Sequence, residues 1–420
     1  MAPNHGGVGA NWAGTYHYRA QGVISARSVD EIAQLVSEGG RIKALGTRHS
    51  FNDIADSPGT LVSVRALGGE PIIDEQRRQV TVPAGMSYGS LGRFLQERGW
   101  ALGNLGSLPH ISVVGACSTA THGSGARNQS LAAAVCNIEF IAGRGRRIDL
   151  NESDPRFLGS VVALGALGIV TTVTLRIEPT YDMRQDVFLN MPWAELAGID
   201  DIMQSAYSVS LFTRWEGAVD QVWVKSRVQN GVSPSKLSGS EAQPATREMS
   251  PTGDPHDNTT TQGGLVGPWN ERLPHFHFDG SPSHGDEIQS EYFVARERGL
   301  DALRALEQIA RTFFPHLIVS ELRYIAADEM WLSPAYGRDS LAIHFTWKNE
   351  PRIVRELLRS IEIVLRPFKA RPHWGKWFSM DAPEISSLYP KFSDFIALVR
   401  EFDPDGQFNN DYLHRVLGLR

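Results

Sequence analysis

Cysteine is scarce in this chain, and two residues among 420 cannot form a disulfide framework. Cys117 and Cys136 could pair only if the fold brought them together, and reduced thiols are the usual state in the cytosol. The first residues also lack the basic start and the apolar stretch of a secretory signal. We therefore expect a cytoplasmic protein with reduced thiols.

Long hydrophobic runs and an excess of positive charge are absent as well. The stretch from Leu164 to Val173 is among the longest apolar runs, yet it contains Gly and Thr and is far shorter than the ~20 residues of a membrane span. The net charge is −6, and the chain has neither a basic stripe nor a heptad run. These absences argue against membrane and nucleic-acid partners, and we expect a monomer.

Several common catalytic motifs are missing too. The chain has no Walker A loop, no His-Glu-x-x-His, no pair of Cys-x-x-Cys, no Gly-x-Ser-x-Gly and no Gly-x-Gly-x-x-Gly that joins a strand to a helix. Gly123-Ser-Gly125 precedes a helix-like run, but so short a pattern is only a weak signal for a nucleotide. We expect no metal site.

The pattern of apolar residues divides the chain near Pro179. The first part reads as short strands punctuated by glycine, with a helix that Ser28 or Asp30 caps and a second helix at 90–98. Its predicted strands cover 41–45, 61–64, 71–74, 79–83, 137–141 and 169–177. The length of 420 residues is itself too large for one ordinary core.

After Pro179 the pattern becomes that of an antiparallel sheet covered by helices. Strands are predicted at 208–213, 221–225, 320–326, 340–347 and 373–378, and amphipathic helices at 299–313 and 352–365. Between them, residues 229–288 are rich in Ser, Pro, Gly, Thr and Asn, which is typical of a surface excursion or a lid. This second part reads as α+β, and helix and loop follow from Ala382 to the end.

Two blocks of small residues stand out in the first part. Gly46-Thr-Arg-His-Ser-Phe-Asn52 follows a strand directly, and the block from Asn104 to Gly125 is dominated by glycine and small hydroxyl residues. Backbone N–H groups can face a phosphate or a flavin edge where no side chain intrudes. Either block alone could be an irregular turn. Together they favour a dinucleotide ligand.

At these blocks the chain resembles the vanillyl-alcohol-oxidase-type FAD enzymes, above all the alditol and xylitol oxidases. Gly46-Thr-Arg-His-Ser-Phe is similar to the flavin-attachment segment of that family, although some relatives have Gly where this chain has Arg48. Further matches are the segments 107–112, 121–125, 333–339, 344–347, 371–376 and 402–408. The resemblance covers essentially the whole chain, in order.

The resemblance implies a two-domain α+β fold and a cofactor, FAD, that is covalently attached through His49. The FAD-binding domain would be 1–179, joined by 379–420, and the substrate-binding cap domain would be 180–378. The other residues implied to contact FAD are Ala44, Leu45, Gly46, Thr47, Arg48, Ser50, Ser107, Ser112, Gly115, Ala116, Cys117, Ser118, Thr119, His122, Gly123, Val170 and His373.

The same resemblance implies the substrate site. Ser107, Glu321, Arg323, Thr346 and Lys376 would hold a polyol, with His344 beside the reacting carbon. The catalytic set would be Lys376, His344, Arg323 and Glu321.

The spacing of these residues is physically suited to that role. Residues two apart in a strand share a face, so Glu321 points the same way as Arg323, and His344 the same way as Thr346. A wall of mixed donors and acceptors suits a chain of hydroxyls. Alternatively, Glu321 and Arg323 form a solvated surface pair and His344 is a core histidine bonded to backbone. Lys376 is either a snorkelling surface lysine or a desolvated one.

The resulting hypothesis is an FAD-dependent oxidase of sugar alcohols such as xylitol and sorbitol. It would oxidise the terminal primary hydroxyl to the aldehyde by hydride transfer to flavin N5, and dioxygen would be reduced to hydrogen peroxide. The alternative is a sugar-1,4-lactone oxidase or dehydrogenase of the gulono- or galactono-lactone type. A non-enzymatic flavin- or sugar-binding protein is a third reading, which the complete set of site residues opposes.

Overall fold

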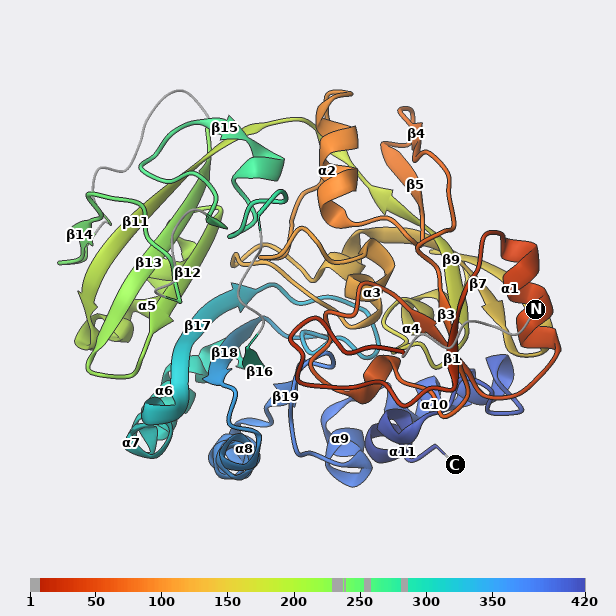
Figure 1. The fold of residues 1–420 in the computed structure, drawn as a ribbon. Helices are drawn as coiled ribbons and strands as arrows, with labels where there is room; N and C mark the ends of the chain where they lie inside the picture. Colours follow the sequence, from red (N-terminus) through yellow and green to blue (C-terminus); the bar gives the residue numbers. More distant parts are fainter. Residues whose placement is uncertain (1–7, 229–236, 238, 253–257, 281–285, 420) are drawn as a thin grey trace.

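The computed structural model describes residues 8–228, 237, 239–252, 258–280 and 286–419, and their strands and helices fall into two parts (Figure 1). The first part begins with a parallel sheet of strand order β1-β3-β2, which are Gly22–Ser25, Thr60–Ser63 and Ile42–Leu45. Helix α1 (Val29–Ser37) packs on this sheet through Ile32 and Val36, and the Ser28 side chain accepts a hydrogen bond from the Glu31 N–H.

A five-stranded antiparallel sheet completes the first part. Its order is β4-β5-β9-β7-β8, which are Ile72–Asp74, Gln79–Pro83, Ile169–Arg176, Val135–Ala142 and Arg146–Asn151. Three helices accompany the sheet, namely α2 (Tyr88–Gln96), α3 (Val113–Ser118) and α4 (Phe157–Val161), and the short strands β6 (Trp100–Ala101) and β10 (Glu178–Pro179) pair with each other. Alternate residues such as Val80, Val82 and Phe140 enter the main core.

The second part is built on a nine-stranded sheet of order β14-β11-β13-β12-β17-β18-β16-β19, with β15 paired to β11. The bounds are β11 Asp182–Pro192, β12 Ser208–Thr213, β13 Ala218–Arg227, β14 Gln243–Pro244, β15 Gly267–Pro268, β16 Glu287–Ala295, β17 Leu317–Ile325, β18 Ser340–Lys348 and β19 Arg371–Pro372. Figure 1 shows helices α6 (Gly299–Glu307), α7 (Ala310–Phe313) and α8 (Pro351–Leu365) beside β16, β17 and β18, and α5 (Ile199–Gln204) lies near β12. Ile343, Phe345 and Trp347, on the opposite face of β18 from His344 and Thr346, lie in the core beside these helices.

The C-terminal segment returns to the first part. It contains α9 (Ala382–Leu388), α10 (Phe392–Phe402) and α11 (Asp411–Leu417). Buried polar side chains join it to the first part: Gln407 Nε2 donates to Val36 O at 2.8 Å, Asn410 Nδ2 to Asp56 O at 2.8 Å and Lys43 Nζ to Phe408 O at 3.1 Å. We keep the division at residues 179 and 378 as a proposal that these contacts support.

Two sequence predictions in the second part were wrong in detail. Residues 373–378 do not form a strand, because a loop of the first part binds their backbone carbonyls. The Phe51 N–H donates to Gly375 O, and Asn52 Nδ2 donates to Trp374 O and Lys376 O. The helix predicted at 299–313 is interrupted between α6 and α7. The antiparallel sheet, its covering helices and the α+β class are confirmed.

Part of the predicted polar excursion, residues 229–236, 238, 253–257 and 281–285, lies outside the described residues. Both cysteines are buried and free. Among the helices of the described residues, none has the length and apolar character that a membrane span requires.

Candidate active site

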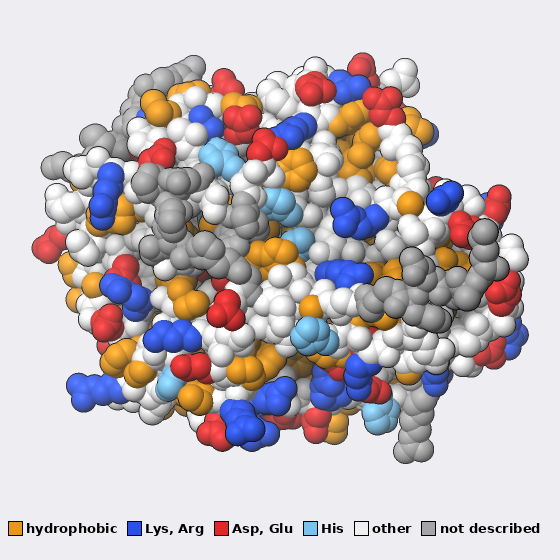
Figure 2. All heavy atoms as spheres, viewed as in Figure 1, with side chains coloured by type: hydrophobic (Ala, Val, Ile, Leu, Met, Phe, Trp, Pro, Cys, Tyr) orange, Lys and Arg blue, Asp and Glu red, His pale blue; other side chains and the backbone are white. Residues whose placement is uncertain are grey.

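A cavity of about 1860 Å³, counted with its open mouth, lies where the two parts of the chain meet. One end is lined by the loops that follow β2 and precede α3, and the other by polar side chains of β16, β17 and β18. Figure 2 shows histidine side chains near the middle of this face, between the large sheet and the first part. One cavity therefore brings the glycine-rich loops of the first part together with the polar strands of the second.

The two blocks of small residues form one wall of this cavity. The Ser112 N–H donates to Thr47 Oγ1 at 3.1 Å, so the blocks are joined directly. A Cβ on Gly46 would lie 3.0 Å from Ser112 Oγ, so the strand end and the N-cap of α3 are in close contact. Within the part of the chain that the structure describes, the backbone N–H groups of 47–50 donate no hydrogen bond, which leaves them for a ligand.

Arg48 lies in the left-handed region, with φ of 63°. Its Nη1 donates to Val8 O at 2.6 Å, and the Trp12 N–H donates to Arg48 O at 2.8 Å. An arginine therefore occupies a conformation that glycine adopts readily. Its side chain anchors the N-terminal segment over the loop.

His49 is a neutral imidazole at the cavity wall. Trp12 stacks on it with ring centroids 5.6 Å apart and planes 20° apart. Burial, reinforced by nearby His110, lowers the pKa of His49 to about 4. Its Nδ1 is buried and has no hydrogen-bond partner in the described part of the chain. An unpartnered ring nitrogen beside a glycine-lined wall fits a covalent bond to a flavin, so the residues present suit FAD.

Most of the residues implied to contact FAD line the cavity. They are Ala44, Gly46, Thr47, Arg48, His49, Ser50, Ser107, Ser112, Gly115, Ala116, Ser118, Thr119, His122, Val170 and His373. Three others point elsewhere. Leu45 packs in a core with Tyr18 and Leu61, because side chains alternate along β2, and Cys117 faces Tyr88 on the inner side of α3. Gly123 lies against the backbone of Leu105, where a Cβ on Gly123 would clash with the Leu105 carbonyl oxygen.

The polar side chains that alternation places on one face of β17 and β18 are buried. Glu321 on β17 is paired with His344 on β18, and Arg323 follows on the same face. Glu321 is 6% exposed and Arg323 4%, which excludes a solvated surface pair. Arg323 Nε lies 3.6 Å from Glu321 Oε2, and Thr346 Oγ1 lies 3.3 Å from His344 Nε2. The partners of His344 are therefore side chains, and the alternative of a core histidine bonded to backbone is wrong.

Lys376 is a desolvated lysine and not a surface lysine that snorkels to solvent, because its side chain is only 13% exposed. Its Nζ donates to Glu291 Oε2 at 2.7 Å and lies 3.3 Å from His344 Nδ1. Burial lowers its pKa, although Glu291 opposes that shift, and burial also lowers the pKa of His344 well below its usual range. A lysine and a histidine with lowered pKa values at one end of a cavity form a candidate proton-accepting pair.

Glu291 on β16 is a site residue that the sequence analysis missed. Its carboxylate is fully buried and bridges Arg323 Nη2 at 2.5 Å and Lys376 Nζ at 2.7 Å. Burial alone would raise the pKa of Glu291, but Arg323 and Lys376 together hold it well below its usual range. Glu291 is therefore the ionised centre of the buried charge cluster.

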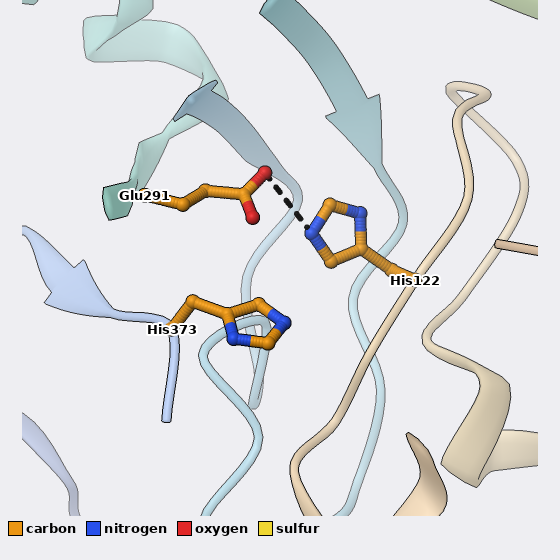
Figure 3. A group of neighbouring side chains, drawn as sticks. All are labelled: His122, Glu291 and His373. Atoms are coloured by element: carbon orange, nitrogen blue, oxygen red, sulfur yellow. Dashed lines mark ion pairs between the residues drawn. The ribbon is translucent and has the colours of Figure 1, made fainter. Parts of the chain in front are cut away.

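His122, Glu291 and His373 point toward one another, as Figure 3 shows, with His122 Nε2 3.3 Å from Glu291 Oε1. The trio resembles a metal site in composition, but its donors do not suit a divalent cation. The two Glu291 oxygens already accept hydrogen bonds from Arg323 Nη2 and Lys376 Nζ. His373 Nδ1 accepts the Gly375 N–H at 3.1 Å, so Nε2 carries the proton and has no lone pair to offer.

His275 is a second site residue that the sequence analysis missed. Its Nε2 lies 2.9 Å from Glu321 Oε1, and burial lowers its pKa to about 4, so a neutral ring donates to the carboxylate. It comes from the polar excursion and lies far from Glu321 in sequence. The Ser107 carbonyl accepts the N–H groups of His275 and Phe276 at 3.1 and 3.3 Å.

Family models match both parts of the chain. A model described as FAD binding domain matches residues 20–151, and one described as D-arabinono-1,4-lactone oxidase matches residues 286–416. Solved structures with the same fold include a solvent-stable cholesterol oxidase, at a TM-score of 0.80 and 15% identity, which covers 98% of this chain and 97% of that one. The vanillyl-alcohol-oxidase-type fold implied by the resemblance is therefore confirmed.

Curated relatives narrow the family. An alditol oxidase of a Streptomyces species is 42% identical over 97% of this chain and 98% of its own length. An L-gulono-1,4-lactone dehydrogenase of Mycobacterium tuberculosis is 28% identical over 98% of this chain and 99% of its own length. An L-gulonolactone oxidase of Bos taurus is 26% identical over 97% of each chain. The chain thus belongs to the alditol oxidase family of FAD-dependent oxidoreductases.

Proposed function

We propose that this protein oxidises the terminal primary hydroxyl of a sugar alcohol such as xylitol or sorbitol to the aldehyde, and passes the electrons to dioxygen to give hydrogen peroxide. The observation that carries the proposal is the buried wall of Glu321, Arg323, His344 and Thr346, with Lys376 at one end. Each of these groups donates or accepts hydrogen bonds, as a polyol requires. The alditol oxidase relative supports the same substrate class.

The arrangement gives each side chain a task. Glu321 and Arg323 would bind the more distal hydroxyls, and Ser107 and Thr346 the nearer ones. Burying a polar group without a partner costs about 1–3 kcal/mol, so the same wall disfavours alcohols that lack the matching hydroxyls.

The bound FAD supplies the two-electron acceptor, and the protein supplies orientation and proton transfer. His49 and the loops around it would hold the flavin, while His344 and Lys376 bind the reacting hydroxyl and take up its proton. Burial lowers the pKa of both groups, which favours the neutral forms that can accept a proton. Glu291 holds Lys376 against His344 during this step.

A lactone oxidase or dehydrogenase is the second candidate. The match of residues 286–416, which include β16, β17 and β18, to the D-arabinono-1,4-lactone oxidase model favours it. A 1,4-lactone presents a five-membered ring with a carbonyl, whereas an alditol presents an open chain of hydroxyls. The two would contact the same wall differently, so substrate choice separates the two candidates.

Oxygen consumption across a substrate panel tests the proposal. Xylitol, sorbitol, mannitol and glycerol are compared with L-gulono-1,4-lactone, each with peroxide detection. We expect kcat/KM to be highest for xylitol or sorbitol and at least about tenfold lower for the lactone, a difference of about 1.4 kcal/mol in transition-state stabilisation. A preference for the lactone would replace the proposal with the second candidate.

Covalent attachment of the flavin through His49 is part of the proposal. The flavin colour should stay with the acid-precipitated protein, and His49→Ala should release it into the supernatant, because the attachment point is gone. His17→Ala, at an exposed histidine, serves as the control. Complete release of flavin from the unsubstituted protein would refute the covalent bond while leaving FAD binding intact.

A further inference from the structure

His275 lies at the end of the cavity away from Lys376. Contacts run in order from Lys376 to His344 at 3.3 Å, from His344 to Glu321 at 3.9 Å and from Glu321 to His275 at 2.9 Å. A chain whose reacting end is held by Lys376 and His344 therefore reaches Glu321 before it meets His275. Phe276 and Pro251, from the same excursion, line the cavity as well.

The segment that carries His275 is held by a buried lysine. Lys225 Nζ on β13 donates to the carbonyls of Arg272, Leu273 and Pro274 at 2.9, 2.6 and 2.8 Å. Lys225 is 1% exposed. An Nζ within hydrogen-bond distance of three successive carbonyls fixes the backbone immediately before His275.

The imidazole itself is confined by aromatic rings. Its centroid lies 5.2 Å from that of Trp223 and 5.7 Å from that of Phe212, both in edge contact. Nε2 donates to Glu321 Oε1, so only Oε2 of that carboxylate faces other partners. The ring is thus both a fixed wall and the group that orients Glu321.

We propose that His275 is a specificity-determining residue that limits the length of the polyol, and that Lys225 is the positioning residue that holds it in place. The inference rests on the proposed alditol oxidation and extends it to a part of the chain, the polar excursion, to which no other role has been given. The length of the bound polyol would thus be limited at the contact between His275 of the excursion and Glu321 of β17.

The test is a series of alditols of rising length: glycerol, erythritol, xylitol, sorbitol and a heptitol. In His275→Ala the wall is gone, so the ratio of kcat/KM for the heptitol to that for xylitol should rise about tenfold, chiefly through KM. His275→Phe keeps the wall but loses the bond to Glu321. It should leave the ratio near that of the unsubstituted protein while KM rises for xylitol and sorbitol.

Lys225→Met should raise the same ratio, because the loop is released, while kcat for xylitol stays nearly constant. A merely structural loss would lower the rates for all alditols by one factor. His275→Val retains part of the packing against Trp223 and Phe212 and replaces His275→Ala if that variant does not fold.

Two failures are distinguishable. If the unsubstituted protein oxidises none of the alditols, the proposed function falls and the inference falls with it. If it oxidises them and His275→Ala or His275→Val changes every kcat/KM by one factor, the inference alone is overturned.

Discussion

Replacing Lys376 by Met should lower kcat for xylitol by about 100-fold to 10,000-fold, the range expected for loss of a proton-transfer group. Met preserves length and apolar bulk but has no donor or acceptor to replace Nζ between Glu291 and His344. The flavin absorbance spectrum should be retained, because the loop that carries His49 is unchanged. Steady-state oxygen consumption, with flavin content measured on the same sample, checks both expectations.

Lys348→Met is the matched control, because Lys348 is an exposed lysine at the end of β18. Its kcat should equal that of the unsubstituted protein. A Lys376→Met protein with full flavin content and nearly normal turnover would remove Lys376 from the chemistry.

Glu291→Gln should have the second large effect, on stability and on pH dependence together. The substitution leaves Arg323 and Lys376 buried without their shared carboxylate, and breaking a buried ion pair from one side costs about 3–5 kcal/mol. A clear fall in Tm is therefore expected. Glu291→Asp, which keeps the charge, should recover part of that loss. Glu307→Gln, at an exposed carboxylate of α6, should leave Tm unchanged.

The pH profile of Glu291→Gln follows from the charges around Lys376. Glu291 and Glu321 raise the pKa of Lys376, whereas burial and Arg323 lower it, and the other titratable groups nearby are His344, His122 and His373. Removal of one negative charge therefore lowers that pKa further. If the neutral amine accepts the substrate proton, the acid limb of kcat should move to lower pH. A limb that moves to higher pH would contradict this assignment.

Sequence alone predicted those parts of the site whose signal is local. Gly46 and His49 lie in the loop that directly follows strand β2, and this loop forms one wall of the cavity. Strand alternation placed Glu321 with Arg323 and His344 with Thr346, because a period of two needs only a few neighbours to be recognised. The contact between the two strands could not be derived from either one.

The residues that were missed depend on distant parts of the chain. Glu291 lies on β16, where Glu287, Gln289 and Glu291 line the cavity and alternate with the buried Ile288, Ser290 and Tyr292. This alternation was the available signal, but it directly follows a long polar stretch. His275 carries no such signal, since its place is set by Lys225 and by the Ser107 carbonyl. Lys376 was predicted as a site residue, but its predicted strand at 373–378 was wrong because Asn52, distant in sequence, binds the backbone carbonyls of that segment.

The most direct test of alditol oxidation is the stoichiometry of one reaction. Purified protein is given a limiting amount of xylitol in air-saturated buffer, and dioxygen consumed, hydrogen peroxide formed and aldehyde formed are measured together. The proposed function predicts one equivalent of each per xylitol oxidised, with the aldehyde at a terminal carbon. A ketose product, or xylitol oxidation that proceeds only with an artificial electron acceptor and no peroxide, would contradict it.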